Sequence, residues 1–156
     1  MLRALRHLMT LLLLLGGLAS ARAELYIVSK TDITGLTERI TERLYTGKQI
    51  EVNNRSLIPL NYVVDSPVRQ KFLTMVIGKT ETEYTAYWAT RRYVGLGTPP
   101  EEVRDRNRML SVLGSRDNAI GYIEATPEEA AELRKRFMVL LVRTTESRTT
   151  ESRAAQ

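Results

Sequence analysis

One stretch, residues 57–72, constrains the fold most, because it joins a strand pattern to a helical pattern through a short polar turn. Its first half is apolar and rich in β-favouring side chains, which predicts a largely buried strand over residues 57–64. Apolar side chains resume at Val68 and Phe72, at helical spacing. The sequence therefore predicts a buried strand that leads directly into a helix.

The polar turn between the two patterns has the residues of a helix start. Asp65 or Ser66 can cap the helix, and Pro67 suits its first turn, where the missing N–H costs nothing. Such a turn leaves backbone N–H groups and the positive end of a helix dipole at one point. This arrangement favours binding of an anion.

The rest of the chain repeats the alternation of strand and helix patterns. Short β-rich runs predict strands at 24–29, 119–123 and 137–142, and Ile50 with Val52 allows one more. Helical patterns are expected at about residues 32–46, 67–77, 80–94, 99–113 and 127–135. The alternation predicts an α/β fold in which helices flank a small mixed sheet.

Two local patterns give sharper expectations. The run Pro99-Pro100-Glu101-Glu102 is assigned to the start of the fourth helix, because proline and acidic residues favour a first helical turn. Asn53-Asn54 predicts a tight turn. The spacing of the aromatic side chains between residues 84 and 88 indicates packing in the core rather than an exposed patch.

The two ends of the chain differ from the middle. Residues 1–23 show the order of a secretory signal peptide, with Arg3 and Arg6, an apolar run and then Ala-Arg-Ala. Cleavage is expected before Glu24, which predicts a secreted, periplasmic protein without a membrane anchor; an uncleaved anchor is the alternative. The repeated Thr-Thr-Glu-Ser-Arg has no apolar residue, so residues 143–156 are predicted to form a disordered tail beyond a domain at 24–142.

Composition excludes several functional classes. The chain has no cysteine, and its only histidine, His7, lies in the predicted leader. The domain therefore lacks cysteine nucleophiles, histidine bases and the usual zinc ligands, so neither an enzyme nor a bound metal or cofactor is expected. The leader carries three arginines and no acidic residue, so its removal lowers the net charge from +5 to +2. This surplus is too small for a dedicated nucleic-acid binder.

Five short motifs, in order, resemble those of the phosphate-binding-protein-like domain proteins, which are relatives of the phosphate-specific periplasmic component of ABC transporters. They are Leu-Tyr-Thr-Gly-Lys at 44–48, Ile-Pro-Leu-Asn at 58–61, Ser-Pro-Val-Arg-Gln-Lys-Phe at 66–72, the Tyr-Trp and Gly-x-Gly-x-Pro-Pro run at 87–100, and Ala-Ile-Gly-Tyr-Ile at 119–123. The resemblance implies a type 2 periplasmic-binding fold reduced to about one lobe. It also implies a small oxyanion such as phosphate as ligand.

The same resemblance implies which residues would hold the ligand. Asn61 occupies the position of an arginine in the full transporters, and Asp65-Ser66 stands in the turn that carries glycine and hydroxyl groups there. Arg69, about one turn into the helix, could pair with an oxyanion. The candidate ligand-binding residues are Asn61, Asp65, Ser66 and Arg69. The alternatives are helix caps at Asp65 and Ser66 and an ordinary surface arginine or ion pair at Arg69.

Two functions follow from these patterns. The first is a non-enzymatic binding domain for a small oxyanion. The second is a protein-interaction module, an accessory part of a cell-envelope assembly in which ligand binding has been lost. The altered turn around Ser66 favours the second, and the sequence leaves both open.

Overall fold

A computed structural model describes residues 22–142. The predicted signal peptide, apart from its last two residues, and the predicted tail lie outside the described residues. Among the helices of the described part, none has the length and apolar character needed to cross a membrane. Likewise, no group of three or more acidic, histidine or cysteine side chains in residues 22–142 is placed to hold a metal ion.

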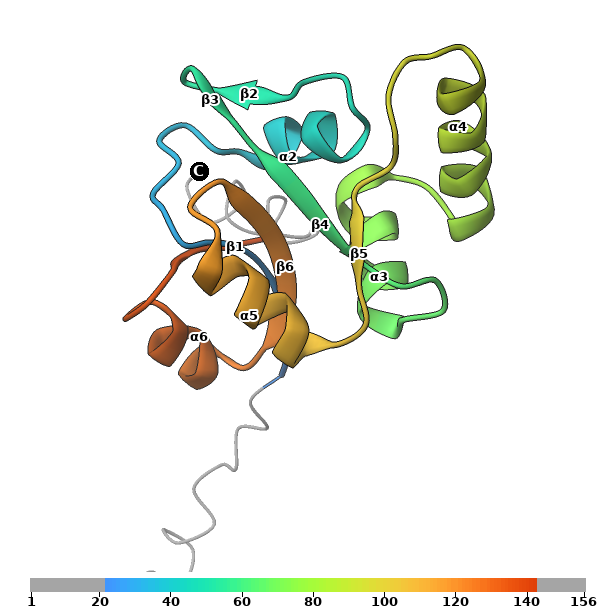
Figure 1. Cartoon of the computed structure of the whole chain (residues 1–156). Coiled ribbons are helices and arrows are strands. Elements are labelled where there is room, and N and C mark those ends of the chain that lie inside the picture. Colours follow the sequence, from blue (N-terminus) through green and yellow to red (C-terminus); the bar gives the residue numbers. More distant parts are fainter. Residues whose placement is uncertain (1–21, 143–156) are drawn as a thin grey trace, which may run out of the picture.

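A five-stranded mixed sheet forms the centre of the molecule (Figure 1). β4 runs parallel to β5 and β6, whereas β1 runs antiparallel to β6 and β7. The small mixed sheet predicted from the sequence is confirmed. In spatial order, the strands are β5 (Glu101–Val103), β4 (Ile58–Tyr62), β6 (Ala119–Ala125), β1 (Glu24–Ser29) and β7 (Met138–Leu141).

Two helices, α5 (Arg106–Ser115) and α6 (Pro127–Leu133), cover one face of the sheet. α5 lies so close to β6 that a Cβ added at Gly121 would come within 2.5 Å of the Met109 sulfur. α6 covers the neighbouring part of this face and contacts both β6 and β7. α5 and β6 are therefore so close at this point that only glycine fits at position 121.

The opposite face carries α2 (Glu38–Tyr45) and α3 (Pro67–Phe72), which continues into a π-helical turn at Leu73–Ile77. Tyr122 of β6 stacks on the Phe72 ring with 3.8 Å between the ring centroids. The strand–helix order predicted for residues 57–72 is therefore confirmed, and its apolar side chains build this half of the core.

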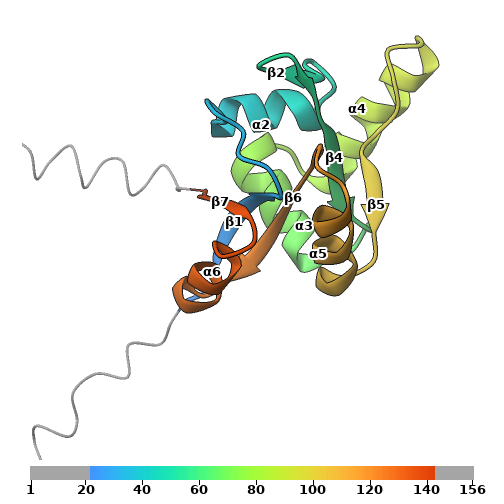
Figure 2. The same cartoon turned by 60° about the vertical axis from the view of Figure 1, so that its left-hand side comes forward.

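A hairpin and one further helix complete the fold. β2 (Glu51–Val52) and β3 (Arg55–Ser56) pair across a turn in which Asn53 and Asn54 have φ of 51° and 61°. Both values lie in the left-handed region that asparagine tolerates, so the predicted turn is confirmed. α4 (Glu81–Tyr93) lies at the periphery in both views (Figures 1 and 2).

Side chains of α4 bind the carbonyl groups at the end of α2. Tyr84, Tyr87 and Arg91 lie three and four positions apart, which puts them on one face of α4. They donate hydrogen bonds to the successive carbonyls of residues 45, 46 and 47, at 2.7, 2.7 and 2.9 Å. The last carbonyls of a helix have no partner within it, so these bonds satisfy α2 and fix the position of α4.

The prediction that a helix starts at Pro99 is wrong. Residues 101–103 form β5, which pairs in parallel with β4, and the helix begins only at Arg106. Asp105 is its N-cap, and its carboxylate accepts a hydrogen bond from the Arg108 N–H at 2.8 Å. Pairing with β4 and burial of Val103, which is 3% exposed, outweigh the local helix-start pattern.

Candidate functional site

The predicted site lies where β4 ends and α3 begins. Asp65 has φ of 72° in the left-handed region, and its exposed side chain extends from the turn. Ser66 occupies the N-cap position of α3 and Pro67 follows it, as the sequence predicts. The Ser66 side chain, however, makes no capping hydrogen bond. The half-buried hydroxyl is therefore not used to cap the helix.

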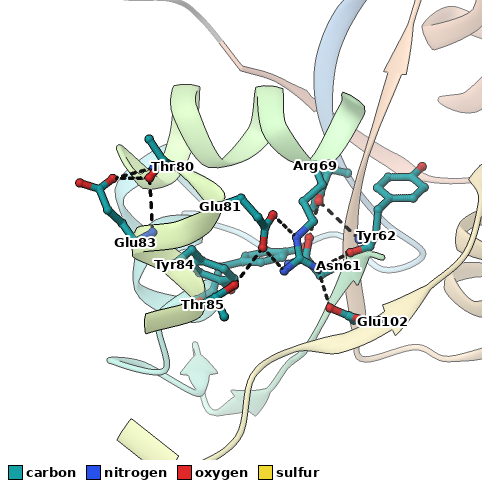
Figure 3. Close-up of polar contacts among 11 residues, drawn as sticks. Asn61, Tyr62, Arg69, Thr80, Glu81, Glu83, Tyr84, Thr85 and Glu102 are labelled. Carbon is teal, nitrogen blue, oxygen red and sulfur yellow. Dashed lines mark hydrogen bonds and ion pairs between the residues drawn. The ribbon is translucent and has the colours of Figure 1, made fainter. Parts of the chain in front are cut away.

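Arg69, three residues after Ser66, is only 4% exposed. Its guanidinium lies between Glu81, Glu102 and Tyr62 (Figure 3). Its Nε and Nη2 atoms donate to the two carboxylate oxygens of Glu81, both at 2.7 Å. Its Nη1 atom donates to the Tyr62 carbonyl at 2.6 Å and to the Glu102 carboxylate at 2.5 Å. The guanidinium is thus held by three partners from three different elements.

Electrostatics fixes Arg69 in its charged form. Burial alone would lower the pKa of the guanidinium, but the hydrogen bonds and charges of Glu81 and Glu102 outweigh burial and raise that pKa. Two carboxylates surround one cation, so the cluster carries a net negative charge. This charge repels an anion that approaches Arg69.

Asn61 points into the core rather than towards solvent, with 1% of its surface exposed. Its Oδ1 atom accepts a hydrogen bond from the Tyr122 hydroxyl, which in turn accepts one from the Tyr62 N–H at 3.4 Å. Burial raises the pKa of Tyr122 far above its usual value, so the hydroxyl keeps its proton. Asn61 therefore forms part of a buried polar network.

The four predicted site residues share one region but have different surroundings. Asp65 and Ser66 lie on the surface turn, while Asn61 and Arg69 lie in the interior with partners of their own. Sequence reasoning missed Glu81 and Glu102 as the partners of Arg69. The sequence pattern predicts a helical turn at Glu102, so no sequence signal brings its carboxylate to this corner.

A second surface feature lies at the other end of β4. A cavity of about 450 Å³ opens between the start of β4, the C-terminal half of α4 and the loop that leads to β5. We call this cavity the α4 groove. Its lining combines polar side chains at Gln49, Thr98 and Glu101 with apolar ones, which include Ile50, Ile58, Trp88, Pro99 and Pro100. β4 has five residues, so the groove and the Ser66 turn are on the order of 15 Å apart.

Solved structures of phosphate-binding proteins share this fold. PstS from Borrelia burgdorferi matches with a TM-score of 0.54 at 16% identity, over 77% of this chain and 47% of that chain. An ABC-type phosphate transport receptor from Vibrio cholerae matches with a TM-score of 0.53 at 18% identity, over 77% and 46%. A Clostridium perfringens protein assigned as a phosphate ABC transporter substrate-binding protein, solved with bound phosphate, gives 0.53 at 15% identity, over 79% and 56%.

These matches show a PstS-like periplasmic-binding fold. The chain spans about half the length of the solved structures it matches, which corresponds to roughly one lobe. No family model and no curated protein sequence matches the chain. The fold predicted from the five motifs is confirmed.

Proposed function

We propose that this chain is an exported, non-catalytic protein-interaction module of a cell-envelope assembly. The observation that carries the proposal is the pairing of Arg69 with Glu81 and Glu102. Arg69 is the cation nearest the predicted ligand turn in sequence, and its hydrogen bonds are directed to protein acceptors. To bind Arg69, an oxyanion would have to displace the Glu81 carboxylate, which already accepts hydrogen bonds from two nitrogens of the guanidinium. It would also have to enter a cluster of net negative charge.

The signal-peptide pattern supports export, and the fold supports a binding role. The proposed partner is a protein of the envelope, because the domain exposes apolar side chains that a protein partner could cover. Exposed apolar side chains lie at the end of α4 and just after it, where Tyr93 is 92% and Leu96 57% exposed. Exposed apolar side chains that lie together indicate contact surfaces in soluble proteins.

A second candidate is the oxyanion site at the Ser66 turn, with Asn61, Asp65 and Arg69 around it. One observation favours it: the hydroxyl of Ser66, a half-buried residue, makes no capping bond. The first N–H groups of a helix also lack partners within it. In this candidate, the hydroxyl and these N–H groups bind phosphate without help from Arg69.

Calorimetry separates the two candidates. The proposed function predicts no saturable heat when the full secreted chain is titrated with phosphate or sulfate up to 10 mM. Saturable heat that is lost in Ser66→Ala and kept in the control Ser56→Ala would favour the oxyanion site and contradict our proposal. Fractionation of the producing cells checks export, because the proposal requires the protein in the envelope fraction.

A further inference from the structure

The α4 groove continues into an exposed apolar loop. A single Arg91 nitrogen, Nη2, donates to the Gly47 carbonyl at 2.9 Å and to the Leu96 carbonyl at 2.8 Å. This shared donor holds the loop at residues 94–97 beside the groove wall at Gly47. Ile50 is 66% exposed at the groove, and Leu96 is 57% exposed on the loop. Together they extend the apolar lining onto the surface.

The rim of the groove has a surplus of positive charge. Arg43 donates to Gln49 at 3.2 Å and to the Lys48 carbonyl at 3.3 Å, so it lies beside residues 48–49, next to the Gly47 carbonyl that Arg91 binds. Within residues 22–142, no carboxylate forms an ion pair with Arg43, Arg91 or the neighbouring exposed Arg92. These three arginines therefore give the rim an excess of positive charge.

The acidic side chains of the rim offset only part of this charge. Glu51, next to Ile50, is exposed and forms no ion pair within residues 22–142, so it cancels one of the three positive charges. Glu42 is paired with Lys48 at 3.2 Å, and Glu101 is paired with Arg116 at 2.6 Å. Each pair is neutral as a whole. The surplus therefore comes from the arginines, and charge complementarity requires carboxylates on whatever occupies the groove.

Hydrogen bonds and close packing within the domain hold the groove wall in place. The three hydrogen bonds from α4 to the end of α2 fix the helix, and Trp88 packs against Gly47 so closely that a Cβ there would lie 2.7 Å from the indole. A preformed surface loses little conformational entropy when it binds. A second copy of the chain is disfavoured as occupant, because a two-fold contact would bring the rim arginines of both copies together.

We propose that the α4 groove binds an extended apolar segment of a partner protein that carries carboxylate side chains. The apolar side chains fill the space beside Ile50 and Pro99, and the carboxylates pair with Arg43, Arg91 and Arg92. This inference rests on the proposed interaction function and assigns it a surface and a class of ligand.

Two matched peptides test the proposal on the full secreted chain. One is a twelve-residue peptide of leucine, proline and glutamate, and the other has lysine in place of each glutamate. Trp88 lines the groove and is the only tryptophan in the sequence, so its emission reports occupancy. The acidic peptide is expected to saturate the emission change and to bind at least tenfold more tightly than the basic peptide.

Variants locate the binding surface. Ile50→Asp and Arg92→Glu are each expected to weaken binding of the acidic peptide by about tenfold or more. Val64→Asp is the control, because Val64 is also an exposed apolar residue, at 46%, but lies at the other end of β4. Thermal unfolding followed by circular dichroism checks that all three variants remain folded.

Several outcomes would overturn the inference. The first is that neither peptide gives a saturable change in emission, and the second is that both peptides bind with equal affinity. The third is that Val64→Asp weakens binding of the acidic peptide as much as Ile50→Asp does. A dimer in sedimentation experiments that Ile50→Asp abolishes would assign the groove to a second copy instead. Failure of the proposed function is distinguishable, because phosphate binding is measured at the Ser66 turn and in a separate titration.

Discussion

The Arg69 guanidinium and the Glu81 carboxylate form a two-pronged ion pair, with both nitrogen–oxygen distances at 2.7 Å. The pair joins the first turns of α3 and α4. Arg69 also binds the carbonyl of Tyr62, so it ties the end of β4 to both helices. In this chain, the arginine beside the predicted ligand turn is a structural residue.

We expect Arg69→Met to lower the free energy of unfolding by about 3 kcal/mol, because it leaves Glu81 without its partner. Urea denaturation measures the loss. Arg92→Met is the control, since Arg92 is exposed, and it should change stability by less than about 0.5 kcal/mol. Equal effects of the two substitutions would show that the ion pair contributes no net stability.

The two carboxylates around Arg69 should contribute differently to the stability of the protein. The Glu81 side chain is 21% exposed and accepts two hydrogen bonds from Arg69, whereas the Glu102 side chain is 45% exposed and accepts one from it. Glu81→Gln is therefore expected to destabilise more than Glu102→Gln, because water screens the more exposed pair. The reverse order in urea midpoints would contradict this ranking.

Tyr122→Phe should destabilise the protein by about 1–3 kcal/mol. The substitution keeps the stacked ring but removes the hydroxyl that donates to the buried Asn61 Oδ1 atom. An unpaired polar atom then remains in the core. Tyr93→Phe, at a position that is 92% exposed, removes a hydroxyl in water and should be neutral. Chemical denaturation of both variants gives the comparison.

Gly121→Ala is expected to cost about 1–3 kcal/mol, because the added methyl group would overpack the interface of β6 with Met109 and Leu113. Gly114→Ala is a matched control within α5. Its nearest neighbours lie 4.0 Å away, and alanine favours a helix, so this change should be neutral or stabilising by up to about 1 kcal/mol. A lower melting temperature for Gly121→Ala together with an unchanged or higher one for Gly114→Ala would confirm the close approach of α5 to β6.

Stability should fall at alkaline pH. Burial raises the pKa of Tyr62 to about 12, and burial together with Glu24 raises the pKa of Tyr26 to about 12. In the unfolded chain, both phenols return to about 10. The unfolded chain therefore loses these protons first, so the stabilisation is complete below pH 10 and is lost as the pH rises towards 12.

Urea unfolding between pH 8 and pH 11.5, with tyrosinate absorbance, measures this dependence. The double variant Tyr26→Phe with Tyr62→Phe should show a shallower fall, because two of the responsible phenols are gone. An unchanged slope in the double variant would contradict the assignment.

Local patterns predicted much of this fold from the sequence. The strand at 24–29, the Asn53-Asn54 turn and the order from β4 to α3 all depend on neighbouring residues, and all are confirmed. β5 was missed because Glu101 and Glu102 become a strand only through their parallel pairing with β4. That pairing joins residues about forty positions apart, which local propensity does not register.

The candidate site was harder to predict for the same reason. The sequence placed Ser66 and Pro67 correctly at the start of α3. It did not show that Arg69 turns inward to two carboxylates from other elements, or that Asn61 meets the Tyr122 hydroxyl. Long-range partners decide whether a polar residue binds a ligand or stabilises the core.

The position of β1 has a consequence for the order of folding. β1 is the first strand of the described chain, yet it is hydrogen-bonded between β6 and β7, which come last. Glu24 pairs with Ala125, on the order of a hundred residues later. The sheet therefore remains incomplete until nearly all of residues 22–142 have been synthesised. Contacts between such distant segments slow folding, so a nascent chain that stops before β6 has no native partner for its opening strand.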